Sequence, residues 1–152
     1  MKTIIFLFII TLITYSAQAQ TCETRVNKLL VAVGSFSAST LYNTYAALGS
    51  IADGFGHDVY DAETVSNLVD AQLRMLDNLI KVMDELKTEK TLQTDSDITY
   101  ANQSIDIMKG LKKQGQLMEE YVNTRKQARL DEYDAQRKKN WSAINKLMGI
   151  DE

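Results

Sequence analysis

Apolar residues recur every three or four positions along four long stretches of the chain, which is the spacing of amphipathic helices. The first stretch follows Cys22 and runs to about Ile51. Small residues fill its middle, positions 34–40, where they either break the helix or let another helix approach closely. We favour a close approach or a kink. Two glycines and several short polar residues at positions 52–58 then predict a turn.

The second stretch has the strongest pattern. Asp61 is the expected N-cap, and Glu63 adds favourable negative charge to the first turn. Charged residues of alternating sign fall near one line and predict a solvated face: Asp70, Arg74, Asp77, Lys81 and Asp84. The residues expected at the opposite, buried face are Leu68, Met75, Leu79, Val82, Met83 and Leu86. Further apolar residues widen this arc, so the helix should contact at least two neighbours: Val65, Leu73, Leu76 and Ile80.

The third stretch begins after a polar segment in which Thr94 to Asp97 predict a loop and a capped helix start. Its apolar residues continue from Ile98 to Val122. Gly110 and Gly115 weaken this helix locally, and we expect them to mark close packing.

A change of apolar phase separates the third stretch from the fourth. The phase is lost at Asn123 and Thr124, and the next stripe runs from Leu130 to Met148. This favours a turn and a fourth helix, with one long bent helix through residues 123–140 as the alternative. Gly149 is expected to end the last helix, with Ile150 folding back.

Helical stretches of similar length favour an all-α, up-and-down helical bundle. It has four helices, or three with a long bent C-terminal helix. The absence of proline from the 152 residues is consistent with long helices. Residues 20–152 are long enough to bury an ordinary hydrophobic core as a single domain, without a metal or a disulfide.

The first residues of the chain predict a cleaved secretory signal peptide, residues 1–19. Lys2 supplies a positive charge, an apolar run follows from Ile4 to Tyr15, and Ala17-Gln18-Ala19 matches the signal-peptidase pattern. The mature chain is then expected to begin at Gln20. The apolar run is shorter than a membrane span, so we expect no transmembrane anchor after cleavage. The predicted location is periplasmic or secreted.

Cys22 is the only cysteine, so it excludes an internal disulfide and a cysteine-built zinc site. Lipid attachment is disfavoured because Ala19, Gln20 and Thr21 do not match the residues that precede a lipoprotein cysteine. In an oxidising compartment the thiol is buried, stays free, or pairs with another chain, which leaves open a homodimer through Cys22.

Charge is balanced overall and segregated along the chain. Lys and Arg number 17 against 20 Asp and Glu, which argues against nucleic-acid binding. Positions 53–97 hold eleven acids and four bases, whereas positions 109–146 hold ten bases and five acids. We interpret the two regions as complementary surfaces within the bundle. A basic site for an anionic partner is the alternative.

Few residues are suited to catalysis. A cysteine nucleophile would need Cys22, near a fraying terminus, beside His57, the only histidine. The chain lacks the Gly-x-Ser-x-Gly elbow of serine hydrolases and the Glu-x-x-His motif of bundle metal sites. We therefore expect no enzyme activity, no catalytic residue and no cofactor.

The glycine-rich loop from Asp53 to Asp61 holds the densest set of metal-ligand residue types: Asp53, His57, Asp58 and Asp61. They are weak candidates for a divalent-metal site, because their spacing matches no calcium loop. Turn formation and capping of the next helix account for the same residues.

The last apolar stripe contains Tyr133, Trp141 and Ile144. It is expected to anchor the final helix to the bundle. If that helix packs weakly, the stripe becomes a surface for a partner.

These observations predict an exported, non-enzymatic helical-bundle protein that acts through protein–protein contacts with another exported or envelope protein. The alternative is a small-ligand or divalent-metal binding module at the Asp53–Asp61 loop. A third hypothesis is a holdase with a protruding helix, which the polar residues 123–140 suggest.

Overall fold

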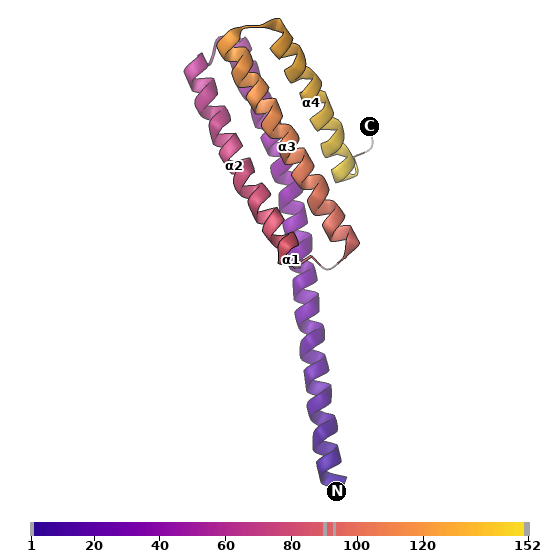
Figure 1. Cartoon of the computed structure of the whole chain (residues 1–152). Helices are drawn as coiled ribbons and strands as arrows, with labels where there is room; N and C mark the ends of the chain where they lie inside the picture. The colour runs from indigo at the N-terminus through magenta and orange to yellow at the C-terminus, as the bar shows by residue number, and fades with distance from the viewer. Residues whose placement is uncertain (1, 90, 93, 151–152) are drawn as a thin grey trace. The chain divides into compact units, whose positions relative to one another are not determined.

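A computed structural model describes residues 2–89, 91–92 and 94–150, with side chains described from residue 24 onward. It contains four helices, α1 (Lys2–Gly56), α2 (Ala62–Thr88), α3 (Asp95–Thr124) and α4 (Gln127–Met148), and no strand in the described ranges. Figure 1 shows α2, α3 and α4 running in alternating directions, joined by short connections. The prediction of an all-α helical bundle is confirmed, in its four-helix form.

The chain divides into two compact units, Met1–Phe36 and Ser37–Glu152. α1 is assigned as one helix throughout, so the small residues at positions 34–40 do not break it. In the part of the chain with described side chains, no helix is both long enough and apolar enough to cross a membrane. The predicted signal peptide lies outside the residues whose side chains are described, and it stays a prediction.

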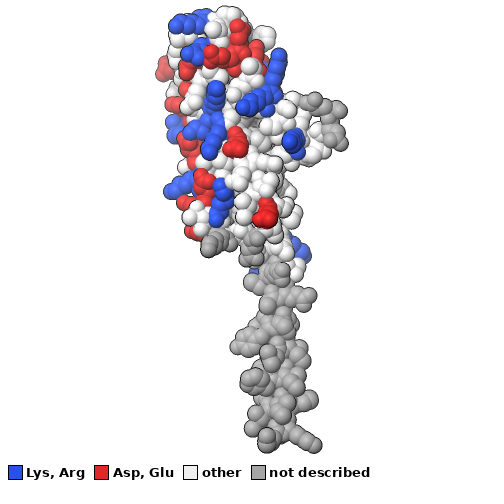
Figure 2. All heavy atoms as spheres, turned by 45° about the vertical axis from the view of Figure 1, so that its right-hand side comes forward, with Lys and Arg blue, Asp and Glu red and all other residues white. Residues whose placement is uncertain are grey.

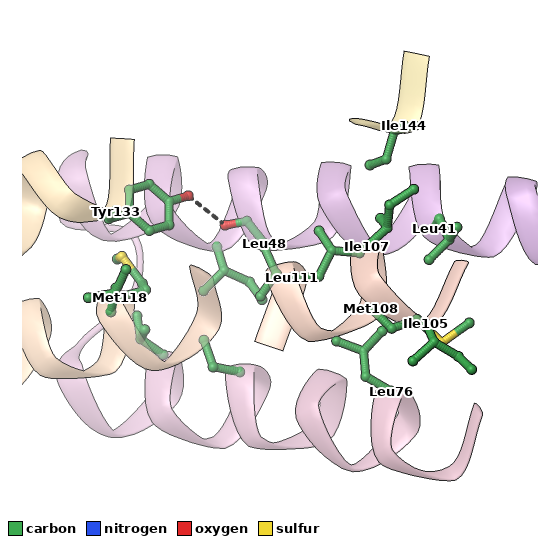
Figure 3. Packing of buried hydrophobic residues seen from close by; sticks show 14 of the residues in the cluster. Leu41, Leu48, Leu76, Ile105, Ile107, Met108, Leu111, Met118, Tyr133 and Ile144 are labelled. Atoms are coloured by element: carbon green, nitrogen blue, oxygen red, sulfur yellow. Dashed lines mark hydrogen bonds between the residues drawn. The ribbon is translucent and has the colours of Figure 1, made fainter. Parts of the chain in front are cut away.

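The second unit contains the hydrophobic core (Figure 3). α3 is buried along most of its length, and Figure 3 shows its apolar side chains between those of α1 and α2. The core residues labelled in that view are Leu41, Leu48, Leu76, Ile105, Ile107, Met108, Leu111, Met118, Tyr133 and Ile144.

The buried face of α2 is rotated from the one predicted. Its buried residues are Val65, Val69, Leu76 and Met83. By contrast, three of the residues expected to be buried are exposed: Leu68, Met75 and Val82. The charged face is solvated as predicted, and its Asp77 carboxylate forms an ion pair with the Lys112 ammonium of α3.

The two glycines of α3 lie at close contacts, as predicted. A Cβ atom on Gly115 would lie 2.9 Å from Leu73 Cδ2, 3.1 Å from Val69 Cγ1 and 3.6 Å from Leu48 Cδ2. A Cβ atom on Gly110 would collide with the side-chain oxygen of Asn140. Both glycines therefore lie where a neighbouring helix packs closely against α3.

The turn between α3 and α4 falls immediately after the predicted change of phase. Arg125 ends α3 in the left-handed conformation at φ 54°, and its N–H donates to the Tyr121 carbonyl at 2.7 Å. The Arg125 guanidinium lies 4.0 Å from the centre of the Phe55 ring, and Tyr121 meets that ring edge-on. These contacts hold the turn against the end of α1.

Candidate functional site

The loop between α1 and α2 is a hydrogen-bonded turn. The His57 N–H donates to the Asp53 carbonyl at 3.0 Å, and the Val59 N–H donates to the Gly54 carbonyl at 2.8 Å. The left-handed residue is Asp58, at φ 57°, and neither glycine of the loop adopts a positive φ. Gly54 instead provides space, because a Cβ atom there would collide with the Tyr60 ring.

The four metal-ligand candidates do not converge. Asp53, His57, Asp58 and Asp61 are all exposed. Across the residues with described side chains, no three His, Cys, Asp or Glu residues are grouped so that they could hold a metal ion. The Asp61 carboxylate accepts a hydrogen bond from the Thr64 N–H at 2.8 Å, which confirms it as the N-cap of α2. The geometry is that of a turn followed by a cap.

The capping bond gives the stability of the bundle a pH dependence. The hydrogen bonds from Thr64 lower the pKa of the Asp61 carboxyl. A lowered pKa in the folded state stabilises the protein above the unfolded pKa of about 3.9. This stability is lost as the pH falls through the folded pKa. We expect Asp61→Ala to lower the thermal midpoint by a few degrees at neutral pH and by less in acid, as followed by circular dichroism.

Asp134→Ala provides the control, because Asp134 is an exposed carboxylate within α4. Its effect should be small, because Asp134 lies within α4 and caps no helix. A loss in Asp61→Ala of the same size at both pH values would exclude the carboxylate as the source of the effect.

The last apolar stripe does not form an exposed partner surface. Tyr133 and Ile144 are buried at 1% and 0% exposure. The Trp141 ring stacks on Tyr45 of α1 at 5.3 Å between ring centres, with Tyr42 at 6.1 Å. The stripe anchors α4 to the bundle, and the partner-surface hypothesis for Tyr133, Trp141 and Ile144 does not apply to the packed helix.

A buried polar network connects α4 to α3 and α1. Gln114 and Asn140 are 0% and 2% exposed, and the Asn140 amide donates to the Gln114 side-chain oxygen at 2.9 Å. The Tyr133 hydroxyl donates a longer bond of 3.4 Å to the Leu48 carbonyl (Figure 3). Burial raises the pKa of the Tyr133 hydroxyl above its ordinary value. Gln136 completes the network by donating to the Asn140 oxygen at 2.8 Å.

A cavity lined by charged residues lies between α3 and α4 and has a volume of about 610 Å³, within the usual range for binding pockets. We call it the α3–α4 groove. Its lining is partly apolar and includes the buried Ile107 and the half-buried Ala143 and Leu147. The charged residues that line it are Asp106, Lys109, Lys113, Lys139 and Lys146.

The α3–α4 groove is strongly basic for a chain whose formal net charge is −3. Four lysines line it against a single aspartate, and none of the four forms an ion pair within the described residues. Figure 2 turns the α4 side of the bundle forward and shows Lys and Arg side chains beside uncharged surface. The groove can therefore attract anionic groups and cover apolar ones.

A second candidate surface lies within the first unit, on residues 24–36 of α1. Large apolar side chains there are exposed: Val26, Leu29, Val31, Val33 and Phe36. Leu29 and Val31 are 66% and 70% exposed. We call this set the α1 apolar segment.

No family model matches the chain, and no curated protein or solved structure gives a significant match. The candidate sites therefore depend on their own geometry.

Sequence reasoning did not identify the α3–α4 groove, although the excess of bases at positions 109–146 was its signal. From the sequence, this excess is interpreted mainly as a surface complementary to the acidic region. The alternative, a basic site for an anionic partner, is the interpretation that agrees with the α3–α4 groove.

Proposed function

We propose that this chain is an exported, non-enzymatic helical-bundle protein that acts by binding another exported or envelope protein. The observation that carries the proposal is the exposure of the α1 apolar segment. Val26, Leu29 and Val33 lie at three- and four-residue spacing, so they share one side of the helix. Soluble monomers rarely leave large apolar patches open to water, and such patches commonly mark protein contacts.

The sequence supports the other two parts of the proposal. The charged start, apolar run and Ala17-Gln18-Ala19 pattern support export. One histidine and one cysteine in the whole chain support a role without catalysis.

Site-specific photo-crosslinking in the producing cells tests the proposal. A photoreactive amino acid at position 29 should give a discrete heavier adduct, because an apolar contact covers Leu29 in the complex. The same amino acid at position 116 is the control, since Gln116 is an exposed polar residue of α3. Mass spectrometry of the exported chain should give Gln20 as its first residue.

Equal crosslinking at positions 29 and 116 would contradict the protein-contact role. A chain retained inside the cell with its first residues intact would contradict export. An adduct of twice the chain mass would identify the bound protein as a second copy.

A further inference from the structure

We propose that the α3–α4 groove is a docking site for an acidic, amphipathic helix of a partner protein. The inference rests on the proposed function in one respect, because it assumes that the chain binds a protein. It adds the location of a binding site and the chemical class of the segment bound there.

Charge complementarity selects an anionic occupant. Lys109 and Lys113 belong to α3, and Lys139 and Lys146 belong to α4, so both walls carry positive charge. The third lysine of α3, Lys112, lies outside the groove and forms an ion pair with Asp77. The lysines of the groove have Asp106 as the only acidic residue among those that line it. An acidic ligand would offset their mutual repulsion.

The distribution of the lysines selects an extended occupant over a single anionic head group. Lys109 and Lys113 are one helical turn apart, and Lys139 and Lys146 are two turns apart, about 10 Å along the axis. One carboxylate or phosphate would reach only part of this set. A helix with acidic residues every three to four positions presents charges at the same intervals.

The apolar part of the lining selects an amphipathic helix. Ala143 and Leu147 are half-buried and line the groove together with the lysines, above the buried Ile107. A helix that places apolar side chains on one face and acids on both flanks would cover these apolar residues and pair with the lysines. This is the helix-in-groove mode of recognition, with apolar anchors at helical spacing.

The experiment measures fluorescence anisotropy of a labelled peptide titrated with the full-length protein. The probe is a helical peptide with leucines on one face and glutamates on its flanks, and a scrambled peptide of equal composition is its control. We expect the probe to bind at least about tenfold more tightly than the scrambled peptide, and binding to weaken as salt is raised, because salt screens exposed charges.

Charge-reversal variants locate the site. Lys113→Glu with Lys139→Glu should weaken probe binding at least about tenfold, because attraction becomes repulsion on both walls. The matched control is Lys126→Glu with Lys138→Glu, which changes the net charge equally at exposed positions that do not line the groove. The control should bind within about twofold of the original protein. All four lysines are exposed, so circular dichroism should show the same helical content in both variants.

Two results would overturn the proposal: equal binding of the probe and the scrambled peptide, or an equal loss in the two double variants. Displacement of the probe by decanoate at a lower concentration than by unlabelled peptide would also overturn it, in favour of a small anionic amphiphile. Crosslinking at position 29 separates this proposal from the proposed function. If that adduct forms while the probe fails to bind, the docking site is wrong and the protein-contact role stands.

Discussion

Replacing Gly115 with leucine should reduce the free energy of unfolding by about 3 kcal/mol, which is a large share of the stability of a small domain. Even a single Cβ atom at this position would contact the side chains of Leu73, Val69 and Leu48. These residues belong to α2 and α1, so a leucine would have to push two helices away from α3. Chemical denaturation followed by circular dichroism measures the loss.

Two further glycine variants separate overpacking from other effects. Gly115→Ala should change stability little, because the higher helix propensity of alanine, about 1 kcal/mol, offsets the tight contact. Gly56→Leu should be tolerated, because no atom lies within 4 Å of a Cβ atom there. A Gly115→Leu protein as stable as the original would show that the three helices do not meet at this point.

Asn140→Ala should cost about 3 kcal/mol, because it leaves a cavity and removes the hydrogen-bond partner of a buried amide. The Asn140 amide donates to Gln114, which is 0% exposed. Without this bond the Gln114 oxygen, which is buried in the folded protein, loses its donor. Tyr133→Phe should cost less, because the two hydrogen bonds of that hydroxyl are long, at 3.4 and 3.5 Å.

A double-mutant cycle with Gly110 tests the geometry behind this second prediction. Gly110→Ala alone should destabilise the protein, because its Cβ atom collides with the Asn140 oxygen. In the Asn140→Ala background that oxygen is absent, so the same change should be neutral or stabilising, with a coupling energy of about 2 kcal/mol. Additive effects of the two changes would mean that residues 110 and 140 are not in contact.

The start of α2, the turn after α3 and the end of α4 were predictable because they depend on local signals. The end of α1 was not, since the helix continues to Gly56 through positions where a turn was expected. Asp61 caps α2 through its own side chain, and Gly149 ends α4 in the left-handed conformation, with the Ile150 N–H bonded to the Asn145 carbonyl. The turn at Arg125 follows the positions where the apolar phase is lost. Each signal lies within a few residues of the feature that it predicts.

The buried face of α2 could not be assigned in the same way. Apolar residues occupy about half of the circumference of α2. The sequence pattern therefore does not show which of these residues contact a neighbouring helix. The middle of the arc was expected opposite the charged line, yet burial centres on Val69 and Leu76 while Val82 is 51% exposed. The packing of α2 against α3 sets which face of α2 is buried. The Asp77–Lys112 ion pair joins the two helices at one edge of that face.

The candidate groove and the buried amides depend on helices that are distant in the sequence. Gln114 and Asn140 are polar, so their residue types predict exposed side chains. They are buried because the Asn140 amide of α4 hydrogen-bonds to the Gln114 side chain of α3. The four lysines form one surface only when α4 folds back along α3. The spacing of apolar and polar residues along the sequence predicts neither the buried amide pair nor the surface formed by the four lysines.

The stacking of Trp141 on Tyr45 gives the protein a built-in optical reporter. Trp141 is the only tryptophan of the chain, and its partner ring belongs to α1. Its emission therefore reports the contact between α1 and α4, whereas circular dichroism reports the helices of the whole chain. If α4 separates before the other helices melt, the emission will change at a lower denaturant concentration than the helical signal. Coincident transitions would show that the contact is lost only when the bundle unfolds as one cooperative unit.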